Sequence, residues 1–122
     1  LYLLRKGALR RLTRDHSFVQ DLVEQGSITE EEAREHPKKN LLTRAVGVEE
    51  KLVVDTGSFT IEAGDIFLLC SDGLTNMVGE AAIRETLQGE SADKARTLVE
   101  LALLAGGLDN ITAIVVECDE RG

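Results

Sequence analysis

The 122-residue chain carries 14 basic and 22 acidic residues, for a formal net charge of −8, and 43% of its residues are apolar. This length favours a single domain, and the apolar fraction is enough for one modest core. Five basic residues and no acidic ones fall within residues 1–14, so the other 108 residues carry a net charge of −13. An acidic body argues against a nucleic-acid-binding surface, and no apolar run is long enough to span a bilayer.

Two short strands are expected at the start, over residues 1–6 and 8–13, with a hairpin turn at Lys6-Gly7. The chain begins within the first of these strands, without an initiator methionine or a preceding turn. We therefore expect the sequence to be a fragment of a longer protein.

Two short helices are expected next, because Ser17 and Thr29 each begin a capping-box pattern with Gln or Glu three residues later. Gly26 marks the end of the first helix, and Pro37 ends the second, since the residue before a proline is disfavoured in a helix. Residues 17–36 are thus expected to form a polar helix–turn–helix segment on the surface.

The middle of the chain predicts strands over residues 41–46, 52–60 and 66–70, with a turn over residues 62–65. The strand at 66–70 is a continuous run of five apolar residues. Such a run is typical of a strand that is buried on both faces.

The last third predicts helices over residues 76–87 and 92–105, the second of them capped by Ser91, and a final strand over residues 111–118. Gly106-Gly107 follows the second helix and is a typical helix stop. This order of elements indicates an α+β fold.

The two cysteines, Cys70 and Cys118, each lie within an apolar run. This position predicts two reduced core thiols in a cytosolic protein, because the sequence has neither a disulfide framework nor the ligand spacing of a zinc site.

Two aspartates stand at the ends of the most apolar strands. Asp72, followed by Gly73, comes just after residues 66–70, and Asp109 precedes the final strand. Two carboxylates at one end of a sheet repel each other unless a cation lies between them or one is protonated. Ligation by oxygen alone favours Mg²⁺ or Mn²⁺ over zinc. The alternative is structural, because Asp-Gly and Asp-Asn pairs are also common in turns.

Three stretches occur together in the chain: LTRDHS with the later GSITEEEA and HP, then GDIFLLCSDGLT over residues 64–75, then GGLDNITAIVV over residues 106–116. In order and spacing they resemble the metal-dependent protein phosphatases of the PPM or PP2C type, particularly the small bacterial members. The resemblance extends over essentially all 122 residues.

The resemblance implies part of an α/β/β/α sandwich, in which two antiparallel sheets are flanked by helices. Residues 1–122 would be the C-terminal part of a single phosphatase domain, with a mobile flap segment at about residues 17–46. The cofactor would be Mn²⁺ or Mg²⁺, with two ions in a cleft between the sheets and a third, weaker ion in bacterial members.

By resemblance, Asp72 and Asp109 are metal ligands, with Asp72 also helping to hold the third ion. Gly73 would pack close to the site, and Asn110 would support the loop of Asp109. The implied activity is hydrolysis of phosphoserine and phosphothreonine in proteins, in bacterial cytoplasmic signalling with a cognate Ser/Thr kinase.

The sequence departs from the family pattern because the motifs that precede this region are absent, among them a phosphate-binding arginine and a general-acid histidine. We therefore assign no catalytic residue to this segment. Two carboxylates are too few to hold two Mg²⁺ ions tightly, so the isolated chain is expected to be an incomplete, inactive fragment.

The alternative hypothesis is a non-catalytic interaction module or pseudophosphatase. Such a protein would have to cover its exposed sheet edge, and a homodimer or a strand swap is the expected way of doing so. A start codon just before Leu1 would favour this hypothesis.

Three other polar residues, two histidines and an arginine, are of types that often occur in functional sites. His16 and His36 are interpreted as structural or solvent-facing, because the sequence shows no positioned partner for either. Arg44 could bind an anion in the cleft, or it could pair with one of the many acidic residues.

Overall fold

The computed structural model of the chain describes residues 1–39, 41–47 and 50–120. These fall into two compact units. The first is made of Leu1–Thr13 and Thr60–Gly122 and contains the sheet, and the second is Arg14–Phe59.

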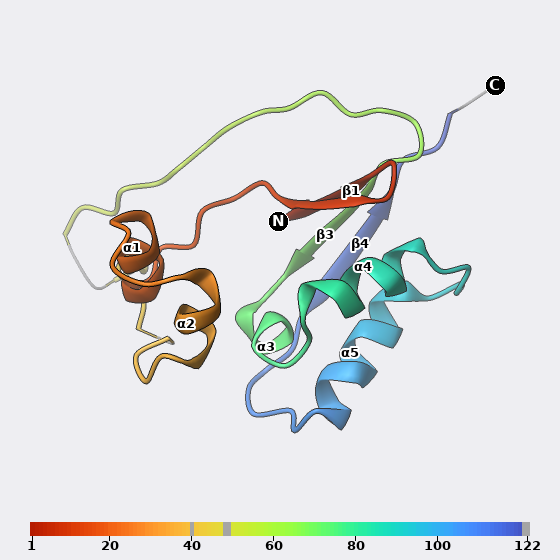
Figure 1. Cartoon of the computed structure of the whole chain (residues 1–122). Coiled ribbons are helices and arrows are strands. Elements are labelled where there is room, and N and C mark those ends of the chain that lie inside the picture. Colours follow the sequence, from red (N-terminus) through yellow and green to blue (C-terminus); the bar gives the residue numbers. More distant parts are fainter. Residues whose placement is uncertain (40, 48–49, 121–122) are drawn as a thin grey trace. The chain divides into compact units, whose positions relative to one another are not determined.

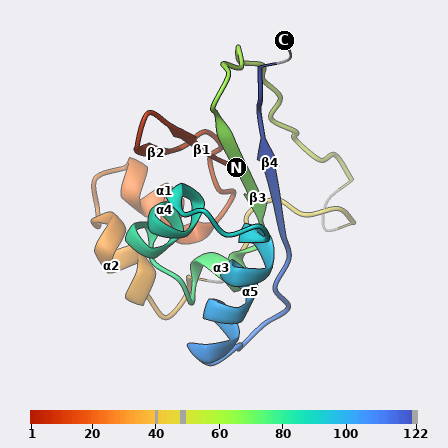
Figure 2. The ribbon, with the colours of Figure 1, turned by 90° about the vertical axis from the view of Figure 1, so that its right-hand side faces the viewer.

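The sheet of the first unit is antiparallel and four-stranded, in the order β2-β1-β3-β4. The strands are labelled in Figure 2. Its strands are β1 (Tyr2–Arg5), β2 (Ala8–Arg11), β3 (Ile66–Cys70) and β4 (Ala113–Glu117). The predicted hairpin is confirmed, with Lys6 and Gly7 in the turn at φ 51° and 79°. A positive φ at both central residues is what a tight hairpin turn requires.

Three helices follow β3: α3 (Asp72–Thr75), α4 (Glu80–Gln88) and α5 (Lys94–Leu104). In both views α4 and α5 lie on one side of the sheet (Figures 1 and 2). They bury Ile83, Leu87, Leu98 and Ala102 against Leu68 and its neighbours in a single core. Fully burying an aliphatic side chain of this size contributes about 1.5–3 kcal/mol, so this core is the main source of stability. Among the described residues, no helix is long and apolar enough to cross a bilayer.

The opposite face of the sheet is less well covered. Leu69 of β3 and its cross-strand partner Ile114 are 44% and 55% exposed, and Val116 is 43% exposed, although Phe67 on the same face is buried. The prediction that β3 is buried on both faces is therefore wrong for its C-terminal part. The reason is that α4 and α5 pack on one face alone, and a strand's side chains alternate between faces.

The second unit contains α1 (Phe18–Glu24) and α2 (Glu30–Glu35), as predicted. The Ser17 hydroxyl accepts a hydrogen bond from the backbone N–H of Gln20, and Thr29 with Glu32 forms a complete capping box. His36, before Pro37, has an extended backbone that ends α2. These helix ends follow from local sequence alone, because each cap bonds within its own first turn.

The two strands predicted over residues 41–46 and 52–60 are wrong. In the described part of these ranges the single β-bridge joins Leu42 to Ser17. Val53 and Val54 are 63% and 66% exposed. An apolar run becomes a stable strand only when it pairs along its length with a neighbour and covers a core. Residues 41–46 make a single bridge, and the apolar side chains of Val53 and Val54 are exposed rather than buried in a core.

The helix predicted over residues 76–87 is wrong at its start, because the chain makes a separate short helix, α3, and begins α4 only at Glu80. Gly79 breaks the two apart with an extended backbone at φ −72° and ψ 160°. Ser91 does not cap the next helix: Asp93 does so by accepting the backbone N–H of Arg96 at 3.0 Å.

An ion pair links Asp65, the residue just before β3, to Arg5 of β1. Asp65 is 1% exposed, and its carboxylate accepts hydrogen bonds from Arg5 Nε at 2.9 Å, Arg5 Nη2 at 2.7 Å and the Glu62 backbone N–H at 2.8 Å. The hydrogen bonds from Arg5 are the main cause that lowers the pKa of Asp65 to about 2, from an ordinary value of 3.8. The sequence predicts a turn at Asp65 but not this pairing, because the partner of Asp65 lies 60 residues away.

This pair predicts a pH-dependent contribution to stability. Because the folded-state pKa is below the unfolded-state value, the contribution is present above about pH 5 and is lost as the pH falls from about 4 to 2. We expect Asp65→Asn to lower the free energy of unfolding at pH 7, and to lower it much less at pH 2, where part of the folded-state carboxyl is protonated. Denaturant unfolding at both pH values measures this, with Asp119→Asn, an exposed carboxylate, as the matched control. An Asp65→Asn deficit that persists undiminished at pH 2 would contradict the assignment.

Candidate metal centre

Asp72 is positioned by the end of β3. Ser71 is the single residue between β3 and α3, and Asp72 is the first residue of α3. The Asp72 backbone carbonyl accepts the N–H of Asn76 at 2.9 Å, and this bond holds Asp72 in the helical turn. Asp72 is an exposed residue. The carboxylate of Asp72 is thus available at the surface.

Asp109 is positioned by the loop between α5 and β4. Gly106 and Gly107 end α5 with φ values of 132° and 53°, a region that glycine adopts without steric cost. One carboxylate oxygen of Asp109 accepts the backbone N–H of Asn110 at 2.7 Å. Asp109 is also an exposed residue.

Strands β3 and β4 bring these two loops to the same end of the sheet. Their last paired residues are Cys70 and Ala113, and beyond them the Ser71 N–H donates to the Thr112 carbonyl at 3.0 Å. The predicted juxtaposition of the two aspartate-bearing segments is therefore present in the fold. It arises from an antiparallel pairing between strands that are distant in sequence.

Gly73 and Asn110 make the closest approach between the loops. A Cβ atom added to Gly73 would lie 2.0 Å from the Asn110 carbonyl oxygen, far inside van der Waals contact. Gly73 therefore lies in tight contact with the backbone of the loop that carries Asp109. Asn110 acts through its backbone, since its N–H bonds the Asp109 carboxylate and its carbonyl faces both Gly73 and the Ser71 hydroxyl.

The carboxylates of Asp72 and Asp109 are the right kind of ligand for a hard divalent cation, but two carboxylates are too few to complete its coordination. Two carboxylates at one end of the sheet are oxygen ligands of the type that Mg²⁺ and Mn²⁺ prefer. No group of three or more His, Cys, Asp or Glu residues that could hold a metal ion occurs within residues 1–39, 41–47 and 50–120. The described residues therefore do not by themselves bring together three such ligands.

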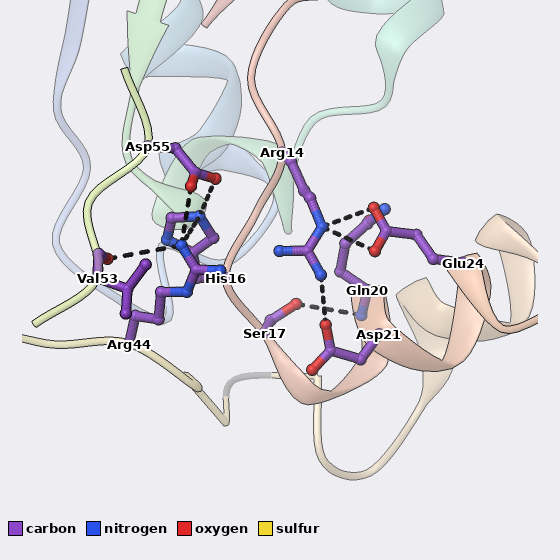
Figure 3. A network of polar contacts seen from close by, with 9 residues as sticks. All are labelled: Arg14, His16, Ser17, Gln20, Asp21, Glu24, Arg44, Val53 and Asp55. Atoms are coloured by element: carbon purple, nitrogen blue, oxygen red, sulfur yellow. Dashed lines mark hydrogen bonds and ion pairs between the residues drawn. The ribbon is translucent and has the colours of Figure 1, made fainter.

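A second polar cluster lies in the unit of residues 14–59 (Figure 3). His16 Nε2 is 2.7 Å from one carboxylate oxygen of Asp55, and Arg44 Nη1 donates to the other at 2.9 Å. The hydrogen bonds from His16 and then Arg44 lower the pKa of Asp55. The structural interpretation of His16 is therefore supported, and Arg44 pairs with an acidic residue. Asp55 was missed because nothing local in its sequence marks it.

The other histidine is likewise a structural residue. His36 Nδ1 accepts the backbone N–H of Lys38 at 3.0 Å, directly after α2. The His36 ring meets the Phe18 ring edge-on with centroids 5.9 Å apart, and Lys38 Nζ lies 5.5 Å from the centre of the same Phe18 ring. These contacts join the end of α2 to the start of α1, which supports the structural interpretation of His36.

The chain forms an antiparallel sheet with helices on one face and an aspartate beyond each of two adjacent strands. This arrangement is expected of half a PP2C-like domain, and comparison with known proteins supports the same relationship. The serine/threonine phosphatase Stp of Listeria monocytogenes is 48% identical over 120 residues, which cover 97% of this chain and 48% of the relative. The crystal structure of the Mycobacterium tuberculosis serine/threonine phosphatase PstP/Ppp matches with a TM-score of 0.88 and 46% identity, covering 98% of this chain and 51% of that one. The PstP catalytic domain in complex with two manganese ions matches with a TM-score of 0.80 and 44% identity, covering 98% and 49%. No family model matches the chain.

The chain is therefore homologous to a part of the bacterial PPM-type serine/threonine phosphatases, as its sequence predicts. The α+β, PP2C-like fold class is confirmed by the same matches. The chain spans about half the length of the curated Stp and PhpP relatives that it matches.

Proposed function

We propose that this chain is the C-terminal part of a phosphatase domain that hydrolyses phosphoserine and phosphothreonine in proteins. In this proposal Asp72 and Asp109 are metal ligands, and the catalytic general acid and phosphate-binding arginine lie outside residues 1–122. The observation that carries the proposal is the packing of the two aspartate-bearing loops against each other at Gly73 and Asn110. The identity to relatives named serine/threonine phosphatases supports it.

The proposed cofactor is Mn²⁺ or Mg²⁺, with two ions in the complete domain and a third, weaker one that Asp72 helps to hold. The manganese complex of PstP supports Mn²⁺ for this family. Bound divalent ions would supply an activated water and neutralise charge on the transferring phosphoryl group. Asp72 and Asp109 would contribute two of the anionic oxygen ligands, and the Gly73–Asn110 contact would hold their loops at the required spacing.

The remaining assignments follow from the same proposal. Residues 17–46 lie within the separate unit Arg14–Phe59 and would form the flap that influences substrate access. The substrate would be a phosphoprotein made by a cognate Ser/Thr kinase in the cytoplasm. The 122-residue chain on its own would bind metal weakly and show no turnover, because it holds too few ligands.

A second candidate, a non-catalytic module that pairs with another copy, is favoured by one observation. Leu69, Ile114 and Val116 form an exposed apolar strip on the outer face of β3 and β4. Exposed apolar patches mark surfaces that another chain or domain covers. Under the first proposal the rest of the phosphatase domain covers this strip.

Hydrolysis assays on a polypeptide that carries the whole domain separate the two candidates. We expect Mn²⁺-dependent hydrolysis of p-nitrophenyl phosphate and of phosphothreonine peptides. EDTA should abolish this activity and added Mn²⁺ should restore it, because the reaction depends on a bound divalent ion. Absence of Mn²⁺-dependent activity from a folded whole domain would favour the interaction module.

A further inference from the structure

Ser71 uses its side chain in an unexpected way. It occupies the N-cap position of α3, where a serine hydroxyl ordinarily accepts a hydrogen bond from the first turn of its own helix. Here the hydroxyl makes no such capping bond. Instead it accepts the backbone N–H of Thr112 at 3.0 Å and lies 3.3 Å from the Asn110 carbonyl, to which it donates.

Both hydrogen bonds of the Ser71 side chain therefore cross to the loop that carries Asp109. Together with the backbone bond from Ser71 N–H to the Thr112 carbonyl, they form three links between residue 71 and residues 110–112. Asp72 is adjacent in sequence to Ser71, and Asp109 is adjacent to Asn110. The strand ladder ends at Cys70 and Ala113, so these links are the hydrogen bonds that continue the pairing toward the two aspartates.

We propose that Ser71 is a positioning residue that holds Asp72 and Asp109 at the spacing needed to share bound metal. This inference rests on the proposed function. Its physical basis is that two carboxylates repel each other when no cation is bound, so loops without cross-links would drift apart. A hydroxyl that bonds both a donor and an acceptor on the opposite loop resists this separation and lowers the cost of ordering the ligands when metal binds.

The test compares Ser71→Ala with Ser91→Ala in a polypeptide that carries the whole phosphatase domain. Ser91 is a matched control because its hydroxyl also accepts a backbone N–H, that of Asp93 at 3.4 Å, but in the loop before α5. We expect Ser71→Ala to raise the Kd for Mn²⁺, measured by calorimetry without substrate, about tenfold or more, as other outer-shell substitutions do. The rate at saturating Mn²⁺ should change far less. Ser71→Thr, which keeps the hydroxyl, should restore most of the affinity.

Equal Mn²⁺ affinity in the Ser71→Ala and Ser91→Ala variants would overturn the inference, even if Ser71→Ala melts at a lower temperature. If Ser71→Ala does not fold, Ser71→Cys provides the same comparison, because a thiol of similar shape is a weak hydrogen-bonding group and a poor Mn²⁺ ligand. Asp72→Asn in the same assay tests the proposed function separately. Loss of Mn²⁺ binding in Asp72→Asn without any effect of Ser71→Ala would refute the role of Ser71 alone.

Discussion

Asp72→Asn and Asp109→Asn, each made in the whole phosphatase domain, are expected to reduce Mn²⁺-dependent hydrolysis of p-nitrophenyl phosphate about 1000-fold or more. A metal that polarises the reacting groups supplies several kcal/mol of transition-state stabilisation, and each 1.36 kcal/mol corresponds to a factor of ten in rate. An amide keeps the shape of the carboxylate but not its charge. The loss of hydrolysis rate therefore measures what the negative charge contributes. Initial rates at increasing Mn²⁺ concentration measure the effect.

Thermal unfolding without metal separates a ligand role from a structural one. Removing one of two carboxylates that repel each other should leave the metal-free melting temperature unchanged or raise it, whereas a structural aspartate would lower it. The Asn side chain at position 109 can still accept the backbone N–H of Asn110, which the native carboxylate accepts at 2.7 Å. The added stability that wild type gains from Mn²⁺ should disappear in both variants, because ligand binding stabilises only the state that binds.

The double variant provides a further check, since ligands of one centre act as a unit. We expect Asp72→Asn combined with Asp109→Asn to be no worse than either single variant, because losses in such a unit are not additive. Asp119→Asn, an exposed carboxylate beyond β4, should retain full activity. Near wild-type rates in both single variants would contradict the assignment of Asp72 and Asp109 as metal ligands.

The parts of the fold that could be predicted from the sequence are those that local chemistry decides. The Lys6-Gly7 turn and the Thr29 capping box need only neighbouring residues, and both are present as predicted. For residues 52–60 the local pattern was not enough, because their apolar residues predict a strand where the structure has none. Whether a partner exists is decided by the tertiary fold, which the pattern does not contain.

In the candidate site, too, the local features could be predicted from the sequence and the contacts between distant segments could not. Asp72 and Asp109 could be selected because each is an acid beside an apolar strand, and family resemblance then assigned them a role. The contacts that join their loops could not be predicted, because they depend on β3 pairing with β4 across 43 residues from Cys70 to Ala113. Ser71 carries no signal in the sequence, where the pattern predicts that the helix begins only at residue 76, and only the fold shows that its hydroxyl bonds the opposite loop.

Gly73→Ala is expected to disrupt both stability and metal-dependent activity. The added Cβ would lie 2.0 Å from the Asn110 carbonyl oxygen and 2.9 Å from its carbon, and these are backbone atoms that cannot rotate away. The two loops must therefore separate. Overpacking of this kind costs about 1–3 kcal/mol of unfolding free energy, and a misplacement of about 1 Å at a reacting centre can reduce the rate about 100-fold.

Helix propensity and the contact with Asn110 predict opposite changes in the stability of Gly73→Ala. Gly73 lies within α3, where alanine would ordinarily be more favourable than glycine by about 1 kcal/mol. A loss of stability in Gly73→Ala can therefore be attributed to the contact with Asn110 rather than to helix propensity. Gly57→Ala is the control, because nothing lies within 4 Å of a Cβ at that position. Denaturant unfolding and Mn²⁺-dependent rates should be nearly unchanged in Gly57→Ala, and a Gly73→Ala variant that is as stable and active as wild type would show that the two loops do not need this close approach.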